Sequence, residues 1–151
     1  MRRLLSTVIL LAVTAVHLGC VSSRMPERCA SFFSMSPDER SKVFPTYPLE
    51  EQLVIYRCGM DSRPPYTYLA GYIADRGEPA IPVLLTKLEQ DPDELTQFSI
   101  VEVFERMAAK GYLRGKADVI NRIRTVVNRM HTPVFKDMAS KSLERITQSS
   151  T

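Results

Sequence analysis

Apolar residues recur three or four positions apart along most of this 151-residue chain, and no segment alternates apolar and polar residues over a sustained stretch. This spacing puts apolar side chains on one face of a helix, whereas a half-buried strand needs a period of two. Proline and glycine divide the pattern into short segments. The sequence therefore predicts an all-α fold of about six helices, with sequential helices packed as antiparallel neighbours.

Local capping signals set the expected helix bounds. Ser36-Pro37-Asp38-Glu39 forms a capping box for a short helix that ends near residue 43. Further helices are expected over 49–60, 66–76, 79–90, 95–110, 116–130 and 133–146. Gly77 and Gly111 suit the left-handed position that ends many helices. We thus expect one α-helical domain at residues 36–148 and a short tail at 149–151.

The first 19 residues differ from the rest of the chain. A basic head, Arg2-Arg3, precedes an apolar run over residues 4–16. A membrane-spanning helix needs roughly 20 apolar residues, so this shorter run predicts an export signal that is removed. Residues 20–35 follow without helical periodicity, and we expect them to form a polar tether.

Charge is unevenly distributed along the mature chain. Without residues 1–19 it carries 18 basic and 17 acidic residues, which argues against a general nucleic-acid binder. Residues 20–105 have a net charge of −6 and residues 106–151 one of +7. If residues 95–130 close as a hairpin, basic side chains could form a salt-sensitive surface for anionic headgroups or an acidic partner; solvated helix faces are the alternative. The candidates are Arg106, Lys110, Arg114, Lys116, Arg122, Arg124 and Arg129.

The segment Leu18-Gly19-Cys20 resembles the lipobox of bacterial lipoproteins, in which the cysteine becomes an acylated N-terminus. Its last two residues match, whereas His17 and Leu18 stand where an aliphatic and a small residue are usual. The resemblance implies a membrane anchor through lipidated Cys20. Val21 then implies the outer membrane of a Gram-negative cell, facing the periplasm. The alternative is a soluble periplasmic or secreted protein that is cut beyond the cysteine.

Two cysteines, Cys29 and Cys58, remain in the exported chain. An even number in an oxidising compartment predicts a disulfide, while free buried thiols and a thiol-redox pair are the alternatives. The redox alternative is weakened because no C-x-x-C motif occurs. His131 is the one histidine of the mature chain, so no metal-ligand spacing is visible, and we expect neither a metal nor a cofactor.

The stretch from Gly77 to Leu88, with its Ala-Ile-Pro-Val-Leu-Leu core, is similar to the turn and second helix of HEAT-like repeats. The resemblance covers residues 66–147 at best, and Gly77 and Gly111 are 34 positions apart. It implies a short array of stacked helical hairpins that serves as a binding scaffold, and it carries no activity. An irregular helical bundle is the alternative, because the repeats differ in length.

No residue pattern points to a reaction. Glycine-rich phosphate loops are absent, and the carboxylate pairs Glu50-Glu51 and Asp93-Glu94 lie in first helical turns, where the helix dipole accounts for them. We therefore expect a non-enzymatic interaction or scaffold module of the cell envelope, with a possible protein partner and no small-molecule substrate. The remaining alternative is an enzyme that uses Cys58 or His131.

Overall fold

A computed structural model describes residues 25–150 of the chain. The expected signal at 1–19 and the expected lipidation site at Cys20 lie outside the described residues. Within the described part the fold is all-helical, which confirms the predicted fold class. Its α-helices are α1 (Glu27–Ser34), α2 (Pro37–Val43), α3 (Leu49–Met60), α4 (Leu69–Ala74), α5 (Ile81–Gln90), α6 (Glu94–Ala109), α7 (Ala117–Arg129) and α8 (Pro133–Ser149), with short 3₁₀ turns η1 (Phe44–Thr46) and η2 (Glu78–Ala80).

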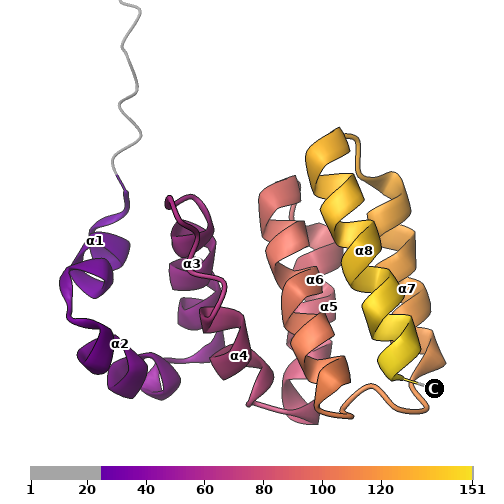
Figure 1. Ribbon diagram of the computed structural model, residues 1–151, viewed down its shortest axis with the longest axis horizontal. Helices are drawn as coiled ribbons and strands as arrows, with labels where there is room; N and C mark the ends of the chain where they lie inside the picture. The colour runs from indigo at the N-terminus through magenta and orange to yellow at the C-terminus, as the bar shows by residue number, and fades with distance from the viewer. Residues whose placement is uncertain (1–24, 151) are drawn as a thin grey trace, which may run out of the picture.

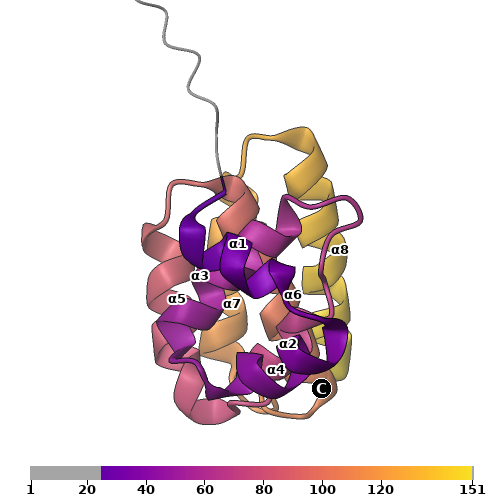
Figure 2. The ribbon, with the colours of Figure 1, turned by 90° about the vertical axis from the view of Figure 1, so that its left-hand side faces the viewer.

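The helices from α4 onward form an array of two layers. Helices α4, α6 and α8 pack in one row and α5 and α7 in a second, while α5 packs on α6 and α7 on α8 across the layers. Figure 1 shows the rows running across the molecule, and Figure 2 shows α5 and α7 on one side with α6 and α8 on the other. The expected hairpin over 95–130 is wrong, because α6 packs on α4, α5 and α8 and hardly touches α7. Sequential helices are thus not always packed neighbours: α6 packs on α8, and α5 packs on α7.

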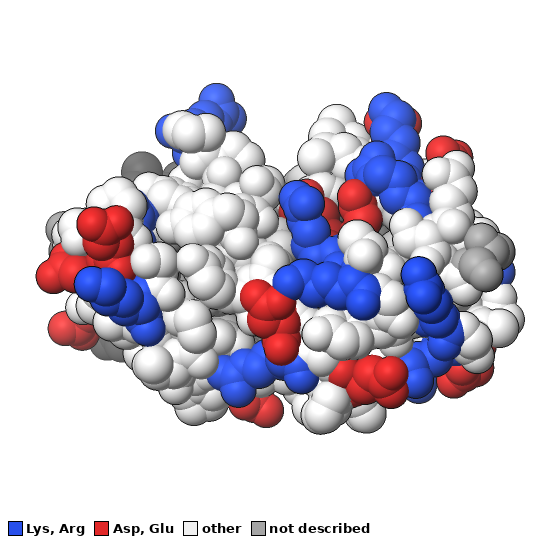
Figure 3. All heavy atoms as spheres, turned by 60° about the horizontal axis from the view of Figure 1, so that its bottom comes forward, with Lys and Arg blue, Asp and Glu red and all other residues white. Residues whose placement is uncertain are grey.

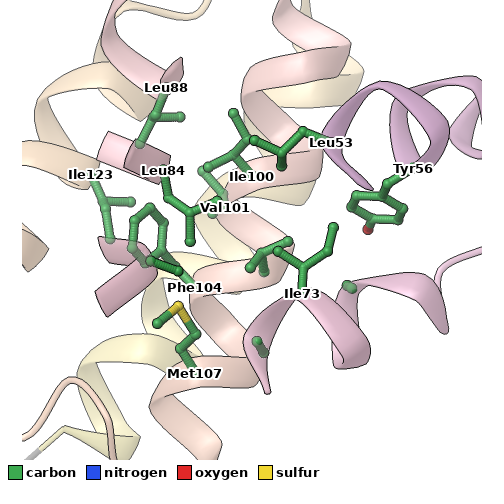
Figure 4. Packing of buried hydrophobic residues seen from close by; sticks show 14 of the residues in the cluster. Leu53, Tyr56, Ile73, Leu84, Leu88, Ile100, Val101, Phe104, Met107 and Ile123 are labelled. Carbon is green, nitrogen blue, oxygen red and sulfur yellow. The ribbon is translucent and has the colours of Figure 1, made fainter. Parts of the chain in front are cut away.

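The core is built around α6. Phe104 points toward Leu84 of α5 and Ile123 of α7, whereas Ile100 points the other way, toward Leu53 of α3 (Figure 4). All five side chains are buried, and full burial of such a side chain contributes roughly 1.5–3 kcal/mol. Since α6 is apolar on both sides, it can connect the array to the N-terminal helices.

Predicted helix starts agree closely with the structure where the cap is local. The capping box is present, because the backbone N–H of Glu39 donates to Ser36 Oγ (3.3 Å) and the N–H of Ser36 donates to Glu39 Oε2 (2.8 Å). Asp93 caps α6 by accepting from the backbone N–H of Thr96 (3.2 Å). Gly77 ends the α4 turn at a φ of 69°, a conformation that disfavours side chains.

The expected tether at 20–35 is wrong for residues 27–34, which form α1. Cys29 and Phe32 of this helix are 0% and 1% exposed. Cys29 is bonded to Cys58 of α3, and the Phe32 ring lies 5.5 Å from the Phe44 ring. These contacts are long-range, so a helix of eight residues with two buried side chains left no periodic pattern to detect.

Aromatic rings and one buried cation fill the space between α1, α2 and the loop after α3. The Phe33 and Tyr66 rings lie 4.7 Å apart, and the Arg40 guanidinium lies 4.9 Å from the Tyr66 ring centre, a cation–π distance. Arg40 is 8% exposed, and its Nε and Nη1 have no hydrogen-bond partner within the described part of the chain. This N-terminal packing differs in kind from the aliphatic core of the array.

Candidate interaction groove

A groove of about 420 Å³ lies between α3 and α5, with α6 as its floor. Helix α3 packs on α1, α4 and α6, and α5 packs on α6 and α7, so the two walls stand apart over α6, whose residues Ser99 and Ile100 are themselves buried. Pro26, directly before α1, lines the groove as well. Ligand sites in proteins have volumes of roughly 300–1,000 Å³, so the groove is large enough to receive another molecule.

The lining of the groove is mostly apolar. On α3 the lining residues follow the spacing of one helix face. Val54 is 41% exposed, and single exposed valines also occur on α5 (Val83) and on α8 (Val134). The α3 wall presents Glu50, Leu53, Val54 and Arg57, the α5 side presents Lys87 and Asp91, and the floor presents Thr96, Ser99 and Ile100.

Hydroxyl groups in the floor are already bonded within α6 and its cap. Ser99 Oγ donates to the Leu95 carbonyl (2.7 Å), and Thr96 Oγ1 donates to Asp93 Oδ2 (2.7 Å). Neither hydroxyl proton is therefore available to a bound molecule. The two oxygens can still accept hydrogen bonds, so the floor lacks free hydroxyl donors but not acceptors.

At the rim, most charges are paired. Arg57 donates to Asp61 and to Asp93, both at 2.6 Å, and Lys87 pairs with Asp91 at 2.7 Å. Partial burial opposes ionisation of Asp93, but the bonds from Arg57 and Thr96 outweigh it and lower the pKa of this carboxyl. Glu50 is exposed and forms no ion pair with any described residue.

One buried polar pair connects α3 to α6 beside the groove. The Tyr56 hydroxyl donates to Glu102 Oε2 at 2.8 Å. Burial raises the pKa of Glu102, although the hydrogen bond from Tyr56 works against this rise. Burial, and then the charge of Glu102, raises the pKa of Tyr56. Each group satisfies the other, so the pair is explained by packing between the two helices.

Most of the seven basic residues expected to form a surface have partners within the fold. Five of them are engaged within the molecule, whereas Arg106 and Arg114 form no ion pair with the described residues. Figure 3 shows Lys and Arg interspersed with Asp and Glu on the face that includes the lower end of Figure 1. The engaged residues are Lys110 (with Asp75), Lys116 (with Glu78, 2.9 Å), Arg122 (with Glu89, 2.7 Å), Arg124 (with Asn121, 2.5 Å) and Arg129 (with the Thr125 carbonyl, 3.3 Å).

Ion pairs between helices share a sequence separation close to the repeat spacing. Four of them join an acidic residue to a basic residue one hairpin later in the chain, with separations of 33 to 40 positions, whereas in Arg57–Asp93 the basic residue comes first. The acidic first half and basic second half are therefore used inside the fold to neutralise one another. The pairs are Asp75–Lys110, Glu78–Lys116, Glu89–Arg122 and Glu105–Arg145.

The cysteines form the predicted disulfide. Cys29 of α1 and Cys58 of α3 are bonded, with their Cα atoms 6.3 Å apart. Cys58 is thus no free thiol in this structure. Its side of α3 also lines the groove, so the covalent bond joins the start of the described chain to the groove wall.

His131 lies exposed in the turn before α8. Its ring makes no hydrogen bond within residues 25–150, whereas its backbone N–H donates to Glu94 Oε1 (2.6 Å) and that of Thr132 donates to Glu94 Oε2 (2.8 Å). Thr132 is the N-cap residue of α8, but its side chain makes no capping hydrogen bond, and the Glu94 carboxylate of α6 instead holds the two backbone N–H groups that precede the helix. Nowhere in the described residues do three or more His, Cys, Asp or Glu side chains group as a metal site.

No protein-family model, curated protein or solved structure matches the chain. Among the helices of residues 25–150, none combines the length and the apolar composition that are needed to cross a membrane. The groove between α3 and α5 is therefore chosen as the candidate site from its geometry alone. The basic residues are a weaker candidate, because most of them are already paired.

Proposed function

We propose that the protein is a lipid-anchored protein of the cell envelope whose helical array acts as a non-enzymatic interaction module. The groove carries this proposal, because it holds the exposed apolar side chain of Val54 between two helices. Grooves of this form receive apolar segments of partner proteins.

The likeness to a lipobox supports the anchor at Cys20. Three acyl chains, at about 0.8 kcal/mol for each buried methylene, would hold a small domain on a membrane permanently. Cys20 precedes Pro26 by six residues, which can span at most about 20 Å when extended. Since Pro26 lines the groove, the anchor would keep the groove close to the membrane surface. With Val21 after the cysteine, the outer membrane facing the periplasm is the proposed location.

The basic residues near the α6–α7 turn have a different orientation relative to this anchor. The turn after Gly111 lies at the lower end of Figure 1, and the described chain begins at the upper end. A helix of 16 residues such as α6 is about 24 Å long. Arg114, which has no ion pair with the described residues, would therefore lie away from the membrane, where an acidic protein is a better partner than lipid headgroups.

Two other functions make different predictions. A soluble periplasmic or secreted protein would have the same array and groove but no acyl chains. An enzyme based on Cys58 or His131 would lose an activity, with stability intact, in Cys58→Ser or His131→Ala. The disulfide of Cys58 and the unbonded ring of His131 give no support to the enzyme.

The intact mass of the protein from native membranes tests the anchor. The expected mass starts at Cys20, includes acyl chains and rises by two hydrogens on reduction. Cys20→Ser should lose the acyl mass, while the neighbouring Ser22→Ala should keep it. An unmodified chain cut elsewhere would overturn the anchor. Crosslinking in intact cells tests the interaction role. If the protein gives only its monomer band and no larger crosslinked species, the interaction role is overturned.

A further inference from the structure

We infer that the aromatic cluster between α1, α2 and α4 binds a carboxylate, which the Arg40 guanidinium holds with the help of the Tyr68 hydroxyl. This is a second site, because neither residue lines the groove between α3 and α5. The inference is therefore independent of the groove, and it does not depend on the lipid anchor. Figure 2 shows this end of the molecule, with α1 and α2 toward the viewer.

Six aromatic rings of the cluster form a closed circuit of contacts. Each ring centre lies 4.7–6.5 Å from the next, which is the usual range for aromatic pairs. In order around the circuit, the rings belong to Phe32, Phe33, Tyr66, Tyr68, Tyr72 and Phe44. The Arg40 guanidinium lies on one of them, 4.9 Å from the centre of the Tyr66 ring. The guanidinium is thus held in place by packing against aromatic rings.

Arg40 has no counter-charge among the described residues. Its side chain forms no ion pair and no hydrogen bond with them, although the residue is only 8% exposed. The carboxylate of Glu39, next in sequence, is occupied because it accepts from the N–H (2.8 Å) and the Oγ (2.7 Å) of Ser36. A buried charge without a counter-charge is unfavourable, so this guanidinium needs an explanation. An anion that binds it would supply the missing charge.

One nitrogen of the guanidinium is open to such an anion. Nε and Nη1 of Arg40 are fully enclosed and have no partner within residues 25–150. Nη2 is not enclosed in this way, so it can donate to a bound oxygen without any movement of the rings. A single charged donor gives a weak site on its own, and a second donor beside it is required.

The Tyr68 hydroxyl is that second donor. Tyr68 is 46% exposed, and its hydroxyl has no hydrogen-bond partner among the described residues. Burial raises the pKa of Tyr68 and the charge of Arg40 opposes the rise, so the hydroxyl lies in the field of the guanidinium. Gly71 follows one turn later on the same side of α4, and nothing lies within 4 Å of the point where a side chain would begin. The remainder of a ligand therefore has room beside the Tyr68 ring.

The charge of the site favours a carboxylate over a phosphate. Arg40 is the one cation among the described groups that affects the pKa of Tyr68. One positive charge neutralises a carboxylate, whereas a phosphate group carries a charge of about −1.5 to −2 near neutral pH and needs further cations. The carboxylate can belong to a free organic acid or to the C-terminus of a peptide, and the experiment separates these two sources.

Titration with benzoate tests the inference on the purified full chain in a non-ionic detergent. Benzamide, which has nearly the same shape but no charge, is the control ligand. NMR follows the Nε–H signal of Arg40 and the backbone N–H signal of Gly71. Benzoate should shift both signals in a saturable way, benzamide should shift neither, and phosphate should bind at least about tenfold more weakly than benzoate.

Three variants assign the binding to the two donors. Arg40→Met removes the charge but keeps an apolar side chain against the rings, so it should fold, and benzoate should bind it at least about tenfold more weakly. Arg114→Met, at an exposed position without an ion pair among the described residues, is the matched control and should bind benzoate unchanged. Tyr68→Phe removes only a hydroxyl from an exposed ring and should weaken binding about threefold. The Gly71 signal reports binding in all three variants.

A pair of peptides then identifies the source of the carboxylate. If trialanine binds at least about tenfold more tightly than benzoate and its C-terminal amide does not bind, the ligand is a peptide C-terminus. Weaker binding of trialanine assigns the site to a free organic acid. Four results would overturn the inference: no saturable shift with benzoate, an equal shift with benzamide, phosphate binding as tight as that of benzoate, or unchanged benzoate binding in Arg40→Met. If Arg40→Met does not fold, unchanged binding in Tyr68→Phe would overturn it instead.

Discussion

The N-terminal region, residues 26–68, and the array from α4 to α8 are stabilised in different ways. Seven of the chain's 12 Phe and Tyr residues lie in the N-terminal region, together with the disulfide and the buried Arg40. The array depends instead on aliphatic side chains between helices and on ion pairs that recur at 33–40 residues. One region therefore depends on a few large contacts, and the other on many similar ones.

Helix length explains why the two regions differ. Helices α1 and α2 have 8 and 7 residues, and isolated helices shorter than about 12–15 residues are marginal in water. They need strong individual contacts to stay folded. Helices α6, α7 and α8 have 16, 13 and 17 residues and cover one another along their lengths. We therefore expect mutations in the two regions to differ in how much stability they remove and in which helices they unfold.

The largest effect should come from the centre of the array. Phe104 is fully buried between α5 and α7, and its replacement in Phe104→Ala should cost about 3–5 kcal/mol of unfolding free energy. Denaturant unfolding would measure this cost. Because α6 also packs on α3 and α4, both regions should unfold together. Met138→Ala, at a position 40% exposed, is the control and should cost under about 1 kcal/mol. Equal costs would contradict the central role of α6.

Loss of the disulfide should separate the two regions. The bond closes a loop with a sequence separation of 29, which stabilises the fold by roughly 3–4 kcal/mol on the chain-entropy account. The Cys29→Ser/Cys58→Ser variant should melt roughly 10 °C lower. Hydrogen exchange should show lost protection in α1 while amides of α6 and α8 keep theirs. If α6 and α8 lose protection to the same extent, the two regions form one cooperative unit.

Within the array, removal of the carboxylate that caps α8 should have a smaller effect. The pKa of Glu94 is lowered from 4.5 because it accepts from the N–H groups of His131 and Thr132. Its stabilisation is therefore present above pH 4.5 and is lost as the pH falls through the lower folded value. Glu94→Gln should lower Tm by a few degrees at pH 7 and flatten the acid part of the curve. The control variant Glu144→Gln, at an exposed position of α8, should leave both the Tm at pH 7 and the acid part of the curve unchanged. Parallel Tm–pH curves for Glu94→Gln and the unchanged protein would refute this cap.

The smallest effect is expected between the two regions, at Glu102. Burial raises its pKa above 4.5, so the stabilisation from its neutral form is complete below pH 4.5 and disappears as the pH rises through the folded value. Glu102→Gln keeps an oxygen for Tyr56 without the charge. At pH 7 the unfolding free energy of this variant should equal that of the unchanged protein or exceed it by up to about 1 kcal/mol. At pH 4 the two unfolding free energies should be the same. A clear loss at pH 7 would show that the charge stabilises the contact.

Helix positions were predictable wherever the controlling residues are neighbours in sequence. The helix at Leu49–Met60 and the capping box at Ser36 follow from such local signals. In contrast, α1 could not be predicted, because Cys29 and Phe32 are buried by residues of other elements. The number of helices was underestimated for the same reason.

The groove was less accessible to sequence reasoning than the fold. Glu50 and Arg57 belong to the polar side of α3 in the sequence pattern, and nothing local shows that Val54 remains uncovered. The ion pairs did leave a signal: the opposite charges of the two halves and the 34-residue spacing of Gly77 and Gly111 reflect the same repeat. Together they could have indicated that the basic residues neutralise earlier acidic ones.

The position of the disulfide has a mechanical consequence. Cys29 lies three residues after Pro26, and its bond leads directly to Cys58 on the wall of the groove. A pulling force applied at the N-terminus would pass through this bond into α3 and bypass the 28 residues between the cysteines. Tension between the N-terminus and a molecule bound in the groove would thus be carried by one covalent link and one helix. The part of α1 after Cys29 and the whole of α2 lie within the bypassed segment and would bear almost none of it.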